Sequence, residues 1–356
     1  MAKKAFYERI RDIDRRLIFL FIALSVIIPL IFDLYFPEEA TPMVQGVFDK
    51  IDNLPDGSRI LIDCSYDPAS MPELQPMATA WVRHAFVKKH KVYTTALWPI
   101  GQQMAVNTLN ESVDFMKRLE PDRRIVYGED YVNLGFKSGG PGVIKVILTN
   151  IGALYSTDIN GTNIADIPMM RGVTNLKSFD LIISISAGFP GSKEWIQFGS
   201  DPAGVAICSG STAVQTPLLY PYFPQQLVGV LGGLKGAAEY ESLLFAKLRK
   251  RLTTRLPLMP EVLTAEVARL QADRQIDEEL REKLIAEKNA QLVALKAVDI
   301  EKLNDRELVD LSVGIFGYTQ KGIRRMGPQA IAHMVIVLFI VIGNITFFID
   351  RRRSKQ

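Results

Sequence analysis

Two long apolar stretches without charged side chains lie near opposite ends of this 356-residue chain. The first covers residues 17–32 and continues to residue 36 apart from Asp33, and the second covers residues 330–349. A helix of about 20 apolar residues crosses the roughly 30 Å hydrocarbon core of a bilayer. The sequence therefore predicts transmembrane helices over residues 17–36 and 328–349. A cleaved signal peptide is the alternative for the first stretch, but the run is long and lacks a small-residue cleavage site.

The charges that flank the stretches predict their orientation, because basic residues stay on the cytoplasmic side of a membrane span. Six basic residues precede the first stretch, and none follows it before Lys50. Basic residues lie on both sides of the second stretch, so its flanking charges alone predict its orientation less clearly. Since two spans place both ends on one side, we expect residues 1–16 and 350–356 to be cytoplasmic. The protein would then lie in a bacterial inner membrane, with its main domain in the periplasm.

The composition of the intervening residues indicates a folded domain that does not bind nucleic acid. The chain is 48% hydrophobic and 23% charged, and it has no low-complexity run. Its 42 basic and 39 acidic residues nearly balance, unlike those of a nucleic-acid-binding protein. We expect an α/β domain over residues 37–256 and a helical region over residues 257–327.

Short runs rich in β-formers alternate with helical stretches in residues 37–256, which is typical of a parallel sheet covered by helices. The expected strands cover residues 59–63, 91–98, 123–128, 180–186 and 204–209. The pattern predicts a Rossmann-like or flavodoxin-like three-layer α/β fold. A final helix over residues 224–252 is expected to close it.

That final helix would contain four glycines, each of which costs up to about 1 kcal/mol in a helix interior. They are Gly229, Gly232, Gly233 and Gly236. Close packing within the domain, a break into two short helices, or an interface with a partner would each offset this cost. Packing within the domain is the favoured interpretation. Asn344, in the second apolar stretch, is a further candidate for contact with a partner helix.

Residues 257–327 are rich in Glu, Lys, Gln, Leu and Ala, which favour helices. Apolar residues recur there at helical spacing, and Asn304 with Glu307 is typical of a helix start. We expect a helical stalk or hairpin that returns the chain to the membrane. A solvated helical pair is at least as well supported as a coiled coil with partners, because few heptads persist.

Candidate ligand-binding residues lie in the loops after the expected strands, because ligands of parallel α/β sheets bind at the carboxyl ends of strands. Asp63 and Asp67 flank the loop after the first strand and suit a divalent cation, although solvated or capping acids are the simpler interpretation. The sequence KSGGPG suits an anion on backbone amides or an ordinary turn, and it is neither a P-loop nor G-x-G-x-x-G. The candidates are Asp63, Asp67, Gly139, Gly140, Gly142, Ser209 and Ser211.

The sequence contains little that supports catalysis, so we expect no catalytic residue, metal site or cofactor. The three histidines, His84, His90 and His333, match no metal-binding spacing. Cys64 and Cys208 lie at the ends of strands that would not be neighbours, so free buried thiols are favoured over a disulfide. The chain is therefore expected not to be an enzyme.

The order of these parts resembles the membrane-anchored auxiliary proteins of ABC-type transporters, including the gliding-motility type. The resemblance lies in the N-terminal anchor, IDNLPDGSRILIDCSYDP leading into an α/β domain, the Glu/Lys/Leu helices of residues 260–310, and the terminal span ending IDRRRSKQ. It implies a binding or scaffolding subunit in a membrane complex, with the lipid bilayer and transporter subunits as partners. A ligand-sensing receptor or enzyme that uses the strand-end loops is the alternative, and an array-forming structural homo-oligomer is a third.

Overall fold

The computed structural model describes residues 14–32, 38–273 and 275–353, which form two compact units. One unit comprises Met1–Glu38 and Lys321–Gln356, and the other, called the body below, comprises Glu39–Gln320. The predicted cytoplasmic ends, residues 1–16 and 350–356, lie largely outside the described residues.

The body is built on a six-stranded parallel sheet, which confirms the predicted α/β class. The strand order is β3-β2-β1-β4-β5-β6, which is the Rossmann order rather than the flavodoxin order. The strands are β1 (Arg59–Ser65), β2 (Lys91–Ala96), β3 (Tyr131–Phe136), β4 (Leu181–Ser186), β5 (Ile207–Ser211) and β6 (Gly229–Gly232).

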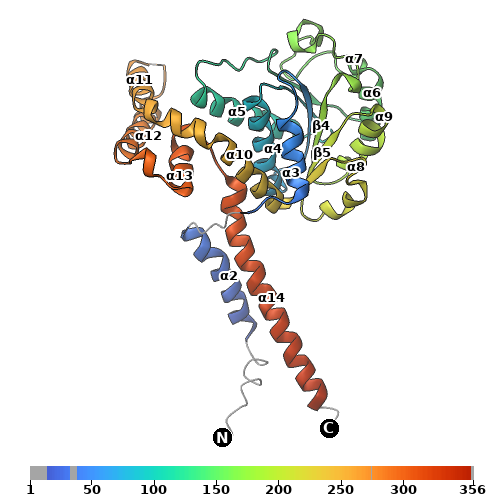
Figure 1. Ribbon diagram of the computed structural model, residues 1–356, viewed down its shortest axis with the longest axis vertical. Helices are drawn as coiled ribbons and strands as arrows, with labels where there is room; N and C mark the ends of the chain where they lie inside the picture. Colours follow the sequence, from blue (N-terminus) through green and yellow to red (C-terminus); the bar gives the residue numbers. More distant parts are fainter. Residues whose placement is uncertain (1–13, 33–37, 274, 354–356) are drawn as a thin grey trace. The chain divides into compact units, whose positions relative to one another are not determined.

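Helices cover both faces of the sheet and make three layers (Figure 1). One face carries α3 (Pro42–Asp52), α4 (Met71–Val87), α5 (Gly101–Leu119) and α10 (Gly233–Arg255). The other face carries α6 (Pro141–Thr149), α7 (Ile151–Leu154), α8 (Ser192–Trp195) and α9 (Asp201–Ala203), with the π-helical turn η4 (Ile196–Ser200) joining the last two. Each interface between a face and its helices is a separate apolar core, as expected for strands buried on both sides.

Short 3-10 helices occupy several of the connections. They are η1 (Ile164–Asp166), η2 (Pro168–Met170), η3 (Leu176–Ser178), η5 (Thr216–Leu218), η6 (Tyr220–Tyr222), η7 (Leu256–Leu258) and η8 (Ile300–Lys302).

The glycine-rich segment is not one helix, because residues 229–232 form the edge strand β6 and α10 begins at Gly233. A Cβ atom on Gly229 would lie 2.3 Å from the carbonyl oxygen of Met43, so α3 approaches the strand too closely for a side chain. Gly233 adopts a φ of +56°, which L-residues avoid, at the junction of strand and helix. Packing within the body therefore accounts for these two glycines.

The prediction of a strand over residues 123–128 is wrong, because the third strand is Tyr131–Phe136. The predicted segment ends in a turn at Gly128, whose φ is +82°. Tyr127 makes only an isolated bridge to Tyr131. The β-forming residues of this segment thus precede β3 and are separated from it by a turn. The periodicity of the sequence does not reveal that turn.

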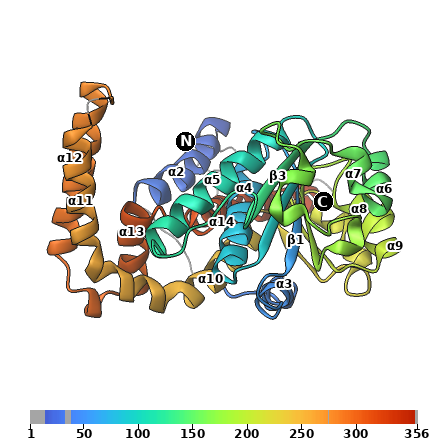
Figure 2. The same ribbon diagram turned by 90° about the horizontal axis from the view of Figure 1, so that it is seen from above.

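Residues 257–320 form a helical hairpin and a return helix that belong to the body. The hairpin consists of α11 (Met259–Ala272) and α12 (Glu278–Lys296), which lie side by side in Figure 2. The return helix, α13 (Asp305–Phe316), packs against α5, where Arg118 donates a hydrogen bond of 3.1 Å to the carbonyl of Ile315. Leu263, Leu295 and Leu308 are buried in the same core as α4 and α10. The base of this hairpin is therefore part of the domain core.

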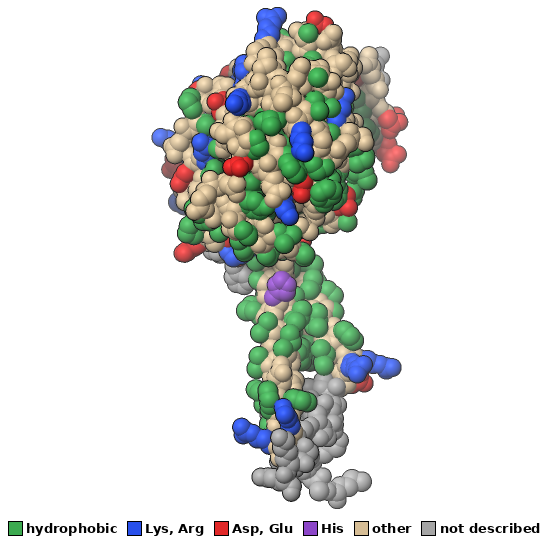
Figure 3. Space-filling model, turned by 90° about the vertical axis from the view of Figure 1, so that its right-hand side faces the viewer, with side chains coloured by type: hydrophobic (Ala, Val, Ile, Leu, Met, Phe, Trp, Pro, Cys, Tyr) green, Lys and Arg blue, Asp and Glu red, His purple; other side chains and the backbone are tan. Residues whose placement is uncertain are grey.

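The other unit contains two apolar helices, α2 (Arg15–Ile31) and α14 (Lys321–Arg353). They lie side by side, and the rings of Phe21 and Phe339 are 6.1 Å apart. Hydrophobic side chains cover much of both helices, and basic side chains lie at the N-terminal end of α2 and the C-terminal end of α14 (Figure 3). Among the described residues, only Lys321–Ile349 is long and apolar enough to cross a membrane. The predicted transmembrane helix over residues 17–36 is therefore not met among the described residues, because α2 ends at Ile31 and the five residues after Phe32 lie outside them.

Candidate functional site

The three central strands β1, β4 and β5 each end with polar side chains at alternate positions. Alternate residues of a strand point to the same face of a sheet. The apolar residues between them, such as Cys64 and Ile185, belong to the core beneath α4. The polar residues therefore point to the opposite face, toward α8. They are Asp63, Ser65, Ser184, Ser186, Ser209 and Ser211, and all are buried.

Asp63, on β1, is the one carboxylate of this polar layer and has no exposed surface. Its two carboxylate oxygens accept hydrogen bonds from Ser65 at 2.7 Å and from Ser184 at 3.2 Å. Ser65 is held in turn by the backbone N–H of Leu97, 3.0 Å away. Burial raises the pKa of Asp63 to about 7, because desolvation of the charged form outweighs these hydrogen bonds.

A chain of serine hydroxyls connects Asp63 to the last strand of this group. Ser209 donates to Ser192 at 2.7 Å, and the Ser192 hydroxyl lies 3.2 Å from that of Ser184, which donates to Asp63. Ser192 is the first residue of α8, and its backbone N–H donates to Ser186 at 3.0 Å. The structure thus brings two of the predicted site residues, Asp63 and Ser209, into one buried network.

The crevice at which a Rossmann sheet usually holds a dinucleotide is closed here. Strand order reverses between β1 and β4, and the loops that follow β2 and β4 meet over the end of β1. There the indole N–H of Trp98 donates to the carbonyl of Pro190 at 3.0 Å. The β1–α4 loop, residues 66–70, also has no glycine to approach a pyrophosphate. These residues do not fit a bound dinucleotide.

Two hollows flank the segment 213–223, which follows β5 and is called the ridge below. The serine pocket has a volume of about 240 Å³, and the apolar groove has a volume of about 530 Å³. The serine pocket is lined by Ser186, Gly188, Phe189, Ser192, Lys193, Glu194, Ser211, Gln215, Leu218 and Leu219. The apolar groove is lined by Thr41, Pro42, Met43, Val44, Thr216, Tyr220, Phe223, Val230, Gly232, Lys235, Gly236 and Glu239. The ridge contributes side chains to both hollows.

The remaining candidate loops lie apart from this network. Asp67 accepts hydrogen bonds from the backbone N–H and the hydroxyl of Ser70, at 2.9 and 2.8 Å, which lower its pKa and fix the start of α4. Gly139, Gly140 and Gly142 follow the edge strand β3, which β2, β1 and β4 separate from β5. The carbonyl of Gly139 accepts the N–H of Gly142 at 3.1 Å, so this loop closes as a turn.

The residues considered as an interface have neighbours within the chain. Gly232 and Gly236 line the apolar groove, and a Cβ atom on Gly236 would lie 2.7 Å from the backbone of Leu231. Asn344 donates a hydrogen bond of 2.8 Å to the carbonyl of Ile340 one turn earlier in α14. Its side chain is exposed within its unit.

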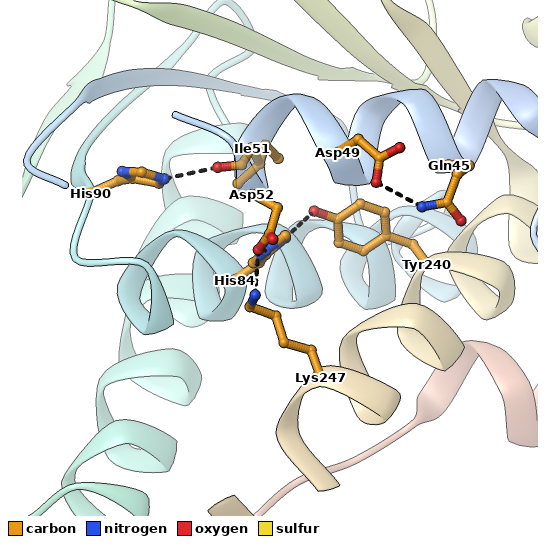
Figure 4. A network of polar contacts seen from close by, with 8 residues as sticks. All are labelled: Gln45, Asp49, Ile51, Asp52, His84, His90, Tyr240 and Lys247. Atoms are coloured by element: carbon orange, nitrogen blue, oxygen red, sulfur yellow. Dashed lines mark hydrogen bonds and ion pairs between the residues drawn. The ribbon is translucent and has the colours of Figure 1, made fainter. Parts of the chain in front are cut away.

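A second polar network fastens the first helix of the body to α4 and α10 (Figure 4). His84 of α4 lies 2.6 Å from the hydroxyl of Tyr240 through Nδ1 and 3.1 Å from Asp52 through Nε2. Asp52 also pairs with Lys247 at 2.5 Å. Burial lowers the pKa of His84 to about 4, so the ring is neutral at physiological pH. A buried histidine with both ring nitrogens engaged within the fold supports packing of α3.

The described residues include no group of three His, Cys, Asp or Glu side chains that could hold a metal ion. Cys64 and Cys208 are free and buried, as favoured from the sequence, and β4 separates their strands. Burial raises the pKa of both thiols. Neither cysteine is therefore placed to act as a nucleophile.

Ser184, Ser186 and Ser192 complete the polar network and are not among the residues chosen from the sequence, although Ser186 and Ser192 lie in a candidate strand-end loop, residues 186–192. A signal for two of them is present: β1 ends in Asp-x-Ser, while β4 and β5 both end in Ser-x-Ser. Polar residues two apart at the ends of otherwise apolar strands must share one face. Comparison with models of protein families, with curated proteins and with solved structures gives no match.

Proposed function

We propose that this chain is a non-enzymatic membrane protein whose α/β body is a binding or scaffolding subunit of a larger membrane complex. The observation that carries this proposal is the apolar groove beside the ridge. Met43, Phe223 and Val230 line it, and Tyr220, which is 50% exposed, stands at its side. Val214, earlier on the same ridge, is 84% exposed. An apolar surface of this kind on a folded domain favours contact with another protein.

The anchoring in this proposal uses both apolar helices. The 17 residues of α2 span about 26 Å at 1.5 Å per residue, close to the thickness of a bilayer core. The excess of basic residues before α2 supports cytoplasmic termini and a periplasmic body in a bacterial inner membrane. The partners are then other membrane subunits, and the resemblance in the order of parts favours those of an ABC-type transporter.

Purification from native membranes in a mild detergent, followed by mass spectrometry and particle sizing, tests this proposal. We expect other membrane subunits in stoichiometric amounts, with an ATPase among them if the complex is of the ABC type. Purification as a lone monomer or dimer would contradict the proposal, and a large homo-oligomer would support the array-forming alternative.

A pair of matched variants assigns the contact to the groove. Tyr220→Asp should reduce recovery of the partner subunits at least tenfold, because it places a charge at the wall of the groove. Leu280→Asp is the control, since Leu280 is 51% exposed but lies on α12. Equal recovery with both variants would exclude the groove as the interface.

A further inference from the structure

The serine pocket has one polar wall and one apolar wall. Ser186, Ser192 and Ser211 present hydroxyls from β4, α8 and β5. Phe189 and Leu218 face it from the loop after β4 and from the ridge. Its volume of about 240 Å³ is below the roughly 300–1,000 Å³ of sites for drug-sized ligands. A ligand of about one ring, polar on one side and apolar on the other, matches these walls.

The hydroxyls of the polar wall are fixed by the structure around them. Ser192 accepts from Ser209, and Ser186 accepts from the backbone of Ser192. Ser211 lies 2.9 Å from the hydroxyl of Thr216, which itself donates to the carbonyl of Thr212. Ser211 must therefore donate to Thr216, and its lone pairs remain to accept from a ligand. This wall is organised before anything binds.

The charges around the pocket disfavour a charged ligand. Lys193 is exposed and has no ion-pair partner among the residues described. Glu194 is buried, and one of its oxygens accepts the backbone N–H of Gly191 at 2.8 Å. The two opposite charges lie on neighbouring residues. The carboxylate of Glu194 would repel an anion in the pocket, and the ammonium group of Lys193 would repel a cation.

We propose that the serine pocket binds a neutral, polyhydroxylated ligand, namely a single sugar ring. Its hydroxyls would exchange hydrogen bonds with the serines and Gln215, and its C–H face would lie on the ring of Phe189. The site is one strand away from the closed dinucleotide crevice. The proposal of sugar binding does not rest on the proposed partner contact at the apolar groove. The sugar is either free in solution or the end of a glycan.

Saturation-transfer NMR on the full chain in lipid nanodiscs, without sugar-based detergents, tests this proposal. The probes are D-glucose, D-glucosamine and D-glucuronate, which share a ring and differ in charge. We expect transfer to glucose, strongest at the protons of its C–H face, and weaker transfer to both charged sugars. Maltotriose distinguishes the sources, since tighter binding of the trisaccharide than of glucose indicates a glycan end.

Variants locate the binding in the pocket. Phe189→Ala, at a side chain that is 70% exposed, should weaken glucose binding about tenfold through loss of the aromatic contact. Gln215→Ala should weaken it as well. Ile100→Ala is the control, because Ile100 is 52% exposed on another strand-end loop and does not line the pocket. No transfer to any sugar, stronger binding of glucuronate, or full binding by Phe189→Ala would overturn the proposal.

Discussion

At the scale of single residues, two buried titratable groups have pKa values shifted in opposite directions. Burial raises the pKa of Asp63 to about 7 and lowers that of His84 to about 4. Between pH 4 and about 6.5, folded Asp63 binds more protons than the unfolded chain does, whereas folded His84 binds fewer. As the pH rises through this window, Asp63 therefore lowers the free energy of unfolding and His84 raises it. The two slopes oppose each other at roughly 1.4 kcal/mol per pH unit each.

Replacement of Asp63 should reveal the pH dependence of the free energy of unfolding that His84 produces and that Asp63 offsets. In Asp63→Asn only the histidine slope remains, so the free energy of unfolding should rise more steeply between pH 4 and 6.5 than in the unchanged protein. Denaturant unfolding at pH 4.5, 5.5 and 6.5 measures this difference. Asp67→Asn is the control, because the lowered pKa of Asp67 lies outside the window. Parallel curves for Asp63→Asn and the unchanged protein would show that Asp63 does not titrate there.

At the scale of elements, α3 is held to α4 and α10 by the network around His84. Phe48 of α3 stacks on the His84 ring with centroids 4.4 Å apart, and Tyr240 of α10 completes the contact. Each ring nitrogen of His84 has one partner from a different helix. The position of α3 therefore depends on polar contacts as well as apolar packing.

Tyr240→Phe should destabilise the body by about 1–3 kcal/mol, because it keeps the ring but leaves a buried imidazole nitrogen without a partner. Gln45→Ala removes an exposed hydrogen bond to Asp49 on the same helix and should change stability by less than about 0.5 kcal/mol. Denaturant midpoints of both variants at pH 7.5 provide the measurement. Equal losses would mean that the buried bond contributes no more than the exposed one.

The periodicity of the sequence predicts most strands of the sheet, but it does not predict which strands are neighbours or which side chains at their ends are in contact. The apolar runs at β1 and β4 are unambiguous, because central parallel strands are buried on both faces. β6 is only four residues long and contains two glycines, at positions where a Cβ atom would clash with the backbone of Met43 or the side chain of Thr216. The β-propensity of its residues therefore does not identify it as a strand. The contact between Ser192 and Ser209 depends on strand order and on the start of α8, which local sequence does not determine. The site was therefore predictable only as a set of separate strand ends.

At the scale of the whole molecule, the proposed topology rests on flanking charge and can be tested by labelling. Both native cysteines are buried, so an introduced cysteine should be the one that reacts. Val214→Cys should be labelled by a membrane-impermeant maleimide in intact spheroplasts. Lys355→Cys should be labelled only after lysis, and the unchanged protein should not react. The reverse pattern would invert the topology.

The ridge of residues 213–223 is a wall shared by two hollows of different chemistry. Gln215 and Leu218 face one hollow, and Thr216 and Tyr220 face the other. By thermodynamic reciprocity, an occupant of one hollow that moves the ridge changes affinity in the other by a factor that is the same in both directions. A change in the concentration of the solute would then change the affinity of the body for its partner subunits. Binding of those subunits would in turn change the affinity of the body for the solute.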